Sequence, residues 1–131
     1  MNHNKFMKKA LKEAKKAFNK NEVPVGAVIV YQGKIIAKAH NLREKSHRAT
    51  AHAEIIAIEK ANKKLKSWRL DNCTMYVTIE PCPMCSGAII QSRIKHLVYG
   101  AKEQKAGSHE SVIKLFEQGY THQVEVSSGI M

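Results

Sequence analysis

Residues 74–92 read TMYVTIEPCPMCSGAIIQS, and this stretch decides the fold. Residues 74–79 are rich in apolar and β-branched side chains, which predicts a strand. Two prolines follow, and because proline favours the first turn of a helix, residues 82–92 predict a helix. Residues 96–99 have the pattern of another short strand. The stretch therefore predicts a strand, a helix and a second strand in direct succession.

The flanking segments extend this alternation. Periodic apolar positions predict three further helices, and apolar or β-branched runs predict a hairpin and a last strand. Residues 40–51 are polar and have no periodic pattern. The expected segments are a helix over residues 4–20, a hairpin of residues 25–31 and 34–39 around Gln32-Gly33, a helix over residues 53–61, a loop over residues 100–108, a helix near residues 112–117 and a strand at residues 124–126.

This order of elements favours an α/β layer architecture in which the middle strands are parallel. The chain has 131 residues, the usual size of one domain, so we expect residues 1–131 to form a single domain. Because no apolar run approaches 20 residues and the N-terminal segment is rich in lysine, we expect neither a membrane span nor export. Three cysteines, two of them three positions apart, suit a metal site better than a disulfide framework, which favours the cytoplasm.

The chain is strongly basic. Twenty-two Lys and Arg residues against eleven Asp and Glu residues give a formal net charge of +11. Such a charge favours contact with a polyanion such as nucleic acid, although a solvated lysine-rich surface explains the composition equally well. The lysines gather in two segments, at positions 5, 8, 9, 12, 15, 16 and 20 and at positions 60, 63, 64 and 66.

Two short motifs carry the chemistry, His52-Ala53-Glu54 and Pro81-Cys82-Pro83-Met84-Cys85. Each is weak alone, because a single histidine is usually a surface residue and a CxxC pair can be a redox centre or half a zinc ribbon. In this order, however, they match the pattern that is typical of zinc-dependent nucleobase deaminases. We therefore expect a hydrolytic zinc centre with one Zn²⁺ per chain.

The residue types suit that chemistry. Cys82 and Cys85 lie within one turn at a helix N-terminus, where the helix dipole favours thiolates over thiols. His52 adds a nitrogen ligand and leaves the fourth tetrahedral position to a water whose pKa falls toward roughly 7. Glu54 stands two residues further on and suits a proton shuttle: it takes the proton of the water, protonates the ring nitrogen and helps the amine leave as ammonia.

Other candidate ligands have simpler explanations. Cys73 would turn the set into a closed structural zinc site, but its place just before a strand is typical of a small core or edge residue. Four histidines have no spacing that recommends them, and we expect them at the surface or in loops: His40, His47, His109 and His122.

The whole pattern closely resembles the bacterial tRNA-specific adenosine deaminase family, within the cytidine deaminase-like superfamily. The matching residues span almost the whole chain: Glu22-Val-Pro-Val-Gly-Ala27, Asn41, Ala51-His-Ala-Glu-Ile55, Glu80-Pro-Cys-Pro-Met-Cys85, Ser92-Arg-Ile94 and Gly100-Ala101. The resemblance implies a three-layer fold with a central five-stranded mixed sheet flanked by helices. It also implies a homodimer that converts adenosine to inosine at the wobble position of a tRNA anticodon stem-loop.

Residue by residue, the resemblance implies His52, Cys82 and Cys85 as zinc ligands and Glu54 as the proton shuttle. Asn41 matches the family residue that hydrogen-bonds the flipped base, and Val23 and Ala53 match positions that line the pocket. Without the resemblance, Asn41 would be interpreted as a residue that caps a loop.

The chain departs from the family at two places. Glu103 and Ala106 stand where the family commonly has aspartate and threonine, in a loop that contacts the nucleic acid. The sequence ends at Met131, where relatives generally continue, so we expect the C-terminal helix to be absent. Two other functions stay open: deamination of a free base or nucleoside of the guanine or cytosine type, and a nonenzymatic RNA-binding module with structural zinc.

Overall fold

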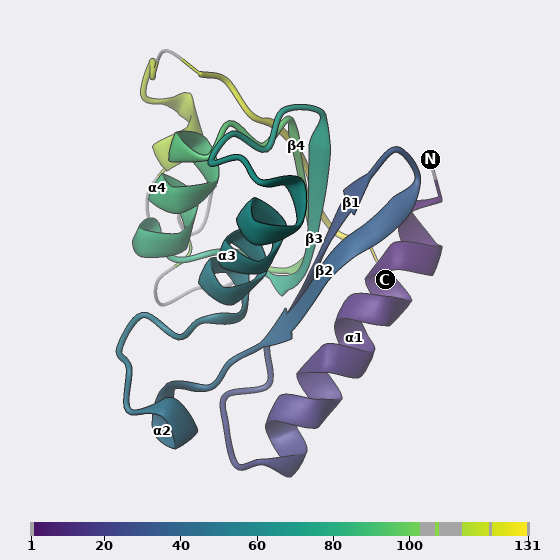
Figure 1. The fold of residues 1–131 in the computed structure, drawn as a ribbon, viewed down its shortest axis with the longest axis vertical. Coiled ribbons are helices and arrows are strands. Elements are labelled where there is room, and N and C mark those ends of the chain that lie inside the picture. Colours follow the sequence, from purple (N-terminus) through teal and green to yellow (C-terminus); the bar gives the residue numbers. More distant parts are fainter. Residues whose placement is uncertain (1, 103–106, 108–113, 121, 131) are drawn as a thin grey trace.

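A five-stranded mixed sheet forms the centre of the molecule in the computed structural model, which describes residues 2–102, 107, 114–120 and 122–130 (Figure 1). The strand order is β2-β1-β3-β4-β5. The β3–β4 and β4–β5 pairs are parallel, whereas β1 pairs antiparallel with both β2 and β3. The strands are β1 (Gly26–Tyr31), β2 (Lys34–His40), β3 (Cys73–Ile79), β4 (His96–Ala101) and β5 (Glu125–Ser127).

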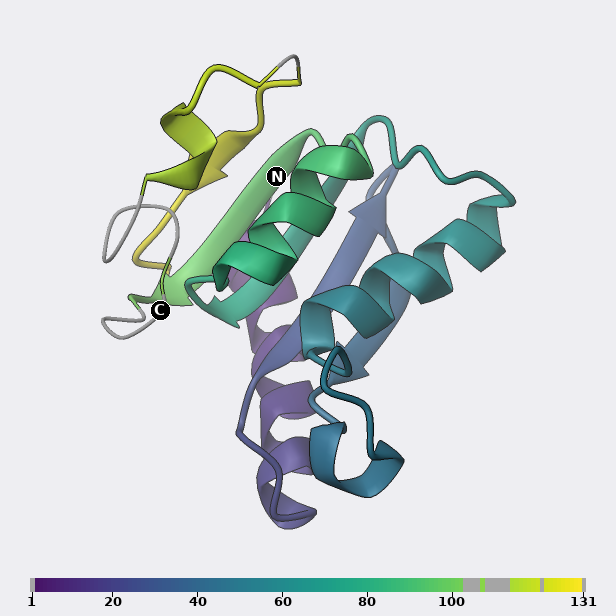
Figure 2. The same ribbon diagram turned by 90° about the vertical axis from the view of Figure 1, so that its left-hand side faces the viewer.

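Helices cover both faces of this sheet, as the expected three-layer architecture requires (Figure 2). On one face, α1 (His3–Asn19) packs Phe6 and Met7 against Tyr76 of β3. On the other face, α3 (Ala53–Leu65) and α4 (Pro83–Gln91) share the larger apolar core. The two helices follow β2 and β3, which run in the same direction, so both helices begin at the same end of the strands and their first turns lie close together.

Gly26 explains how closely α1 approaches β1. A Cβ atom at this position would lie 2.0 Å from the carbonyl oxygen of Ala10 and 2.4 Å from the backbone nitrogen of Ala14. Since real Cβ contacts are never so short, only glycine lets the helix and the strand approach this closely. This contact packs α1 directly against the start of β1.

Several sequence-based expectations need correction. The polar segment 40–51 contains a short helix, α2 (Arg43–Ser46). The expected helix near residues 112–117 is a single 3₁₀ turn, Leu115–Glu117, within the described residues; positions 112 and 113, like Glu103, Ala106 and His109, lie outside them. The middle strands are only partly parallel, because the hairpin adds β1 antiparallel to β3.

The expectation for His40 is also wrong. This residue ends β2, and its side chain is only 12% exposed. Its Nδ1 lies 2.9 Å from the carboxylate of Glu13, and the ammonium group of Lys20 lies 3.1 Å from its Nε2. His40 therefore joins α1 to the end of β2 instead of lying free at the surface. His47 is exposed as expected, and His122 lies in a loop, where its Nε2 is 2.8 Å from the carbonyl oxygen of Ile94.

Two further findings concern elements that are absent from the described part of the chain. No helix there is long and apolar enough to cross a membrane. No helix follows β5 in the described residues up to Ile130.

Candidate active site

Three side chains of the types that bind metals converge where α3 and α4 begin. His52 is the N-cap residue of α3, Cys82 is the N-cap residue of α4, and Cys85 lies in the first turn of α4. Neither N-cap side chain makes a capping hydrogen bond to its own helix. Both side chains are therefore available to a ligand in the space between the two helix ends.

The distances between these donors suit one tetrahedral metal ion. The Nδ1 atom of His52 lies 3.7 Å from Sγ of Cys82 and 3.4 Å from Sγ of Cys85. With zinc–sulfur bonds of about 2.3 Å and a zinc–nitrogen bond of about 2.0 Å, tetrahedral angles place such donors roughly 3.6 Å apart. Within the described residues, this trio is the one group of three His, Cys or acidic side chains close enough to hold an ion, and Cys73 is not part of it.

The two thiols favour a bound cation as well. A hydrogen bond from the Cys85 thiol lowers the pKa of Cys82 to about 5, against the opposing effect of burial, and His52 lowers it further. The same hydrogen bond, together with burial, raises the pKa of Cys85. Cys82 therefore loses its proton easily, whereas Cys85 keeps its proton while its neighbour is a thiolate. A divalent cation can take the place of the Cys85 proton, because thiolates are the form that binds metal.

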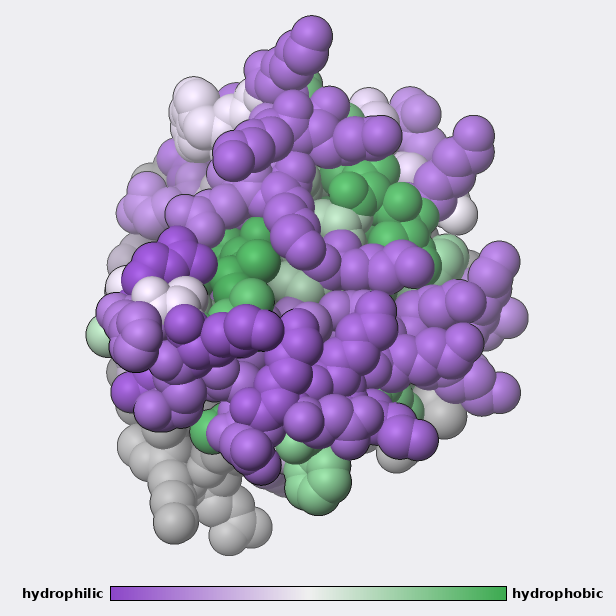
Figure 3. Space-filling view, turned by 60° about the horizontal axis from the view of Figure 1, so that its bottom comes forward, coloured by the Kyte–Doolittle hydropathy of each residue, from purple (hydrophilic) through white to green (hydrophobic). Residues whose placement is uncertain are grey.

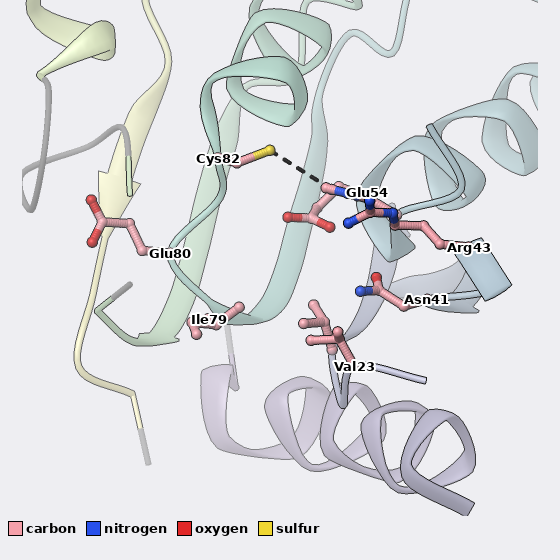
Figure 4. Close-up of a pocket in the computed structure, with 9 residues that line it drawn as sticks. Val23, Asn41, Arg43, Glu54, Ile79, Glu80 and Cys82 are labelled. Atoms are coloured by element: carbon pink, nitrogen blue, oxygen red, sulfur yellow. Dashed lines mark hydrogen bonds between the residues drawn. The ribbon is translucent and has the colours of Figure 1, made fainter. Parts of the chain in front are cut away.

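Glu54 lies beside this trio in the first turn of α3. Its side chain is buried, with 3% of the residue exposed, and the carboxylate points into the cavity (Figure 4). Burial raises the pKa of Glu54 to about 7, and the charge of Cys82 acts in the same direction. Hydrogen bonds from its own backbone N–H and from Cys85 oppose the increase. A carboxyl group in this environment can both accept and return a proton near neutral pH.

A cavity of about 180 Å³ opens in front of these groups. Of the residues expected to bind substrate, Val23 and Asn41 line this cavity, but Ala53 does not. Ala53 is fully buried and reaches the site only through its backbone N–H group. The lining residues are Val23, Val25, Asn41, Arg43, His52, Glu54, Ile79, Glu80 and Cys82.

Asn41 makes a capping contact and also lines the cavity, so its position is compatible with both roles that the sequence left as alternatives. Its Oδ1 atom accepts a hydrogen bond of 2.7 Å from the backbone N–H of Ala53, at the first turn of α3. Because the donor is a backbone N–H, the oxygen must face the helix and the NH₂ group must face the other way. Figure 4 shows the Asn41 amide at the cavity beside Glu54. The helix thereby fixes the orientation of a hydrogen-bond donor at the cavity wall.

Comparison with known proteins identifies the family. A model of the MafB19-like deaminase family matches residues 1–131. The tRNA-specific adenosine deaminase of Bacillus subtilis (strain 168) is 52% identical over 127 residues, which cover 96% of this chain and 79% of that protein. The chain belongs to the tRNA-specific adenosine deaminase family.

Two solved structures have the same fold. A tRNA:A34 deaminase that edits A to I at the wobble position of transfer RNA is 44% identical, with a TM-score of 0.92 over 95% of this chain and 91% of that one. Guanine deaminase from Bacillus subtilis is 38% identical, with a TM-score of 0.75 over 92% of this chain and 88% of that one. Both neighbours confirm the expected cytidine deaminase-like fold with its five-stranded mixed sheet.

Sequence reasoning missed one wall of the cavity of this deaminase. Arg43 lines the cavity from α2, and Ile79 and Glu80 line it from the end of β3. The carboxylate of Glu80 turns away from the cavity in Figure 4. The position of Ile79 and Glu80 just before the Pro-Cys motif was the available signal. Arg43 gave none, because it lies in a segment without a pattern.

Glu22 holds the Arg43 wall in place. Its buried carboxylate accepts hydrogen bonds from the backbone N–H groups of Glu44, at 3.1 Å, and Lys45, at 2.9 Å. These N–H groups belong to the first turn of α2, whose own N-cap residue, Leu42, makes no side-chain capping bond. Glu22 therefore supplies the missing cap from another segment, and it is adjacent in sequence to Val23, which also lines the cavity.

Removing this cap should loosen the cavity wall without affecting the groups that carry out the reaction. For Glu22→Ala we expect the KM of the deaminase for its substrate to increase several-fold while kcat changes little, because α2 loses its cap and Arg43 its fixed position. Glu22→Gln keeps one acceptor oxygen and should fall between the alanine variant and the wild type. Steady-state kinetics of the three proteins check this, and an equal loss in kcat with unchanged KM would contradict the assigned role.

Proposed function

We propose that this chain hydrolyses adenosine to inosine at the wobble position of tRNA, with Zn²⁺ held by His52, Cys82 and Cys85. The observation that carries the proposal is the buried carboxylate of Glu54 beside three converging metal donors at an open cavity. A purely structural metal site has no need of an acid in that position. The 52% identity to a tRNA-specific adenosine deaminase supports the choice of substrate.

The residues of the chain account for each proton in the reaction. Zinc, when bound, lowers the pKa of a water toward roughly 7 and so supplies the hydroxide nucleophile. Glu54 accepts the proton that this water loses and passes it to the ring nitrogen next to the reacting carbon. It then takes the proton of the hydroxyl group that has added to the carbon and transfers it to the amino group, which leaves as ammonia. Water is consumed, and the carbon–nitrogen bond is replaced by a carbonyl.

The cavity walls orient the base for this attack. Asn41 presents its NH₂ group as a donor to an acceptor atom of the base, while Val23 and Ile79 offer apolar contacts to the ring faces. Ala53 holds Asn41 through its N–H group. Arg43 at the rim provides a positive charge for a phosphate group of the RNA.

Asn41→Asp tests the donor separately from the cap. Aspartate retains the oxygen that accepts from Ala53, so thermal stability should stay close to that of the wild type. It replaces the NH₂ donor by an acceptor, so we expect kcat/KM for the RNA substrate to fall about tenfold to hundredfold. Asn41→Ala should lose stability as well. Thermal denaturation and steady-state kinetics of both variants measure the difference, and full activity of Asn41→Asp would overturn this role for Asn41.

We also infer that the active form is a homodimer of single-domain chains in the cytoplasm, where the substrate RNA is found and thiols stay reduced. Light scattering during size-exclusion chromatography measures the assembly. A strictly monomeric enzyme with full activity would contradict the dimer.

Substrate choice is tested directly with zinc-loaded protein. The substrates are an anticodon stem-loop that contains adenosine at the wobble position, free adenosine, cytidine and guanine. We expect inosine and ammonia from the stem-loop only. Conversion of guanine without conversion of the stem-loop would favour a guanine deaminase, a class that also contains a structural neighbour of this chain. RNA binding without any turnover would favour a nonenzymatic role.

A further inference from the structure

The exposed side of α1 carries a continuous row of lysines. Lys5, Lys8, Lys9, Lys12 and Lys16 recur at intervals of three and four residues, so they share one side of the helix. Phe6, Met7 and Ala10 occupy the opposite side and are buried against the sheet. We refer to the five lysines as the lysine row. At about 1.5 Å per residue the row is roughly 16 Å long.

Within the described residues, little neutralises this row. Glu13 is the one acidic residue of α1; it is 4% exposed and pairs with Lys16 and His40. Lys8, Lys9 and Lys12 have no hydrogen-bond or ion-pair partner within the part of the chain that the structure describes. Like charges three and four residues apart destabilise a helix. The row thus carries an unfavourable repulsion that a polyanion would relieve.

The lysines also enclose a space. Lys5, Lys8, Lys9 and Lys12, together with Asn2 and Asn4, line a surface hollow of about 450 Å³. Ammonium and amide groups on its rim can all donate hydrogen bonds to an anion. The face that includes the C-terminal end of α1 is mostly hydrophilic (Figure 3).

The row leads toward the cavity. Beyond Lys16, the ammonium group of Lys20 contacts His40, whose neighbour in the chain is Asn41 on the cavity wall. Figure 4 shows α1 running beside the cavity, on the side of Val23. A polyanion that enters the cavity with one end can therefore continue along α1.

We propose that the lysine row binds the phosphate backbone of the RNA stem that follows the loop in the cavity. This proposal rests on the proposed function and extends it from the reacting base to the helical part of the substrate. A straight, rigid row of charges matches a stiff duplex, whose backbone carries regularly spaced phosphates. An anionic membrane is the weaker alternative, because most of the apolar side of α1 is packed on the sheet and cannot insert into lipid.

Two triple variants test the proposal with equal changes in charge. One replaces Lys5, Lys8 and Lys12 by glutamine; the control replaces Lys63, Lys64 and Lys66, which lie at the end of α3 on the opposite face of the sheet. Affinity is measured for the product stem-loop, with inosine at the wobble position, over a range of salt concentrations. The α1 variant should bind on the order of tenfold more weakly. The plot of log K against log salt concentration has a negative slope, and this slope should become less negative by about 3.

The control variant should keep a slope close to that of the wild type. In the α1 variant kcat at saturating stem-loop should be unchanged, KM should increase, and the melting temperature should not fall, because like-charge repulsion is removed. Affinity for the single-stranded loop sequence without its stem should be equal in all three proteins. This last arm separates contacts with the stem from contacts with the loop.

Three results would overturn the proposal. The first is an equal loss of slope in both triple variants, which would indicate a diffuse effect of net charge. The second is a loss of affinity for the loop sequence as large as that for the stem-loop. The third is loss of binding to phosphatidylserine vesicles with unchanged RNA binding, which would point to a membrane. If the wild type binds the stem-loop with the expected slopes but does not deaminate it, the proposed function fails and the lysine row does not.

Discussion

Glu54→Ala is expected to lower kcat about 10³-fold while the protein keeps its metal, since proton transfer by a positioned carboxylate contributes this order of magnitude. Glu54 is not one of the three converging donors, so its removal leaves the metal-binding set intact. The cavity keeps its other walls as well. We therefore expect nearly unchanged KM together with the large loss in kcat, measured with the adenosine stem-loop and zinc-loaded protein.

Glu59→Ala is the matched control for this variant. Glu59 lies on the same helix, and its side chain is exposed to solvent. Its replacement removes a carboxyl group of the same kind and should leave kcat within about twofold of the wild type, as is usual for surface positions. Metal analysis of both variants completes the test. Loss of zinc from Glu54→Ala would contradict the shuttle role, because it would make Glu54 part of the metal-binding set.

Cys82→Ala is expected to remove both the metal and the activity. The variant leaves one thiol and one imidazole, which are too few ligands for a stable zinc site. Turnover should fall to the background rate, because the metal supplies several kcal/mol of transition-state stabilisation. Zinc content by elemental analysis and the release of ammonia from the stem-loop are the two measurements.

Cys73→Ala distinguishes this open site from a closed one with four protein ligands. Cys73 is fully buried in the apolar core, and burial raises its pKa to about 11, which favours the neutral thiol over a ligand thiolate. Alanine at this position should keep one zinc per chain and most of the activity. If Cys73→Ala lost its zinc as Cys82→Ala should, the centre would be structural and the proposed reaction would have no open coordination position.

Local patterns were sufficient for most of the fold. The strand over residues 74–79 and the helix after it could be predicted because apolar periodicity and the two prolines act within a few residues of each other. The positions of His52 and Cys82 at helix starts followed from the same signals, and the structure confirms them. Their convergence in space could be predicted as well, because the His-Ala-Glu and Pro-Cys motifs together match the known signature of zinc-dependent deaminases.

Contacts between distant segments explain what sequence patterns missed. The helix α2 depends on the carboxylate of Glu22, more than 20 residues away, and not on a cap in its own segment. His40 is drawn inward by Glu13 of α1, a partner that no periodicity reveals. The orientation of the Asn41 amide has the same origin. The sequence does not show that the N–H group of Ala53 holds the oxygen of Asn41 and so leaves its NH₂ group free to face the cavity.

The positions of His52 and Cys82 have a consequence for folding as well as for catalysis. They lie 30 positions apart in the sequence, at the starts of two helices that no disulfide links. An ion held between them would link the two helices in the folded state across a loop of that length, and it would be released when the chain unfolds. Because the ion binds the folded state, its concentration also sets how strongly that state is favoured. With the proposed ion bound, the catalytic centre would also act as a reversible cross-link, and removal of the metal should lower the stability of the fold together with the activity.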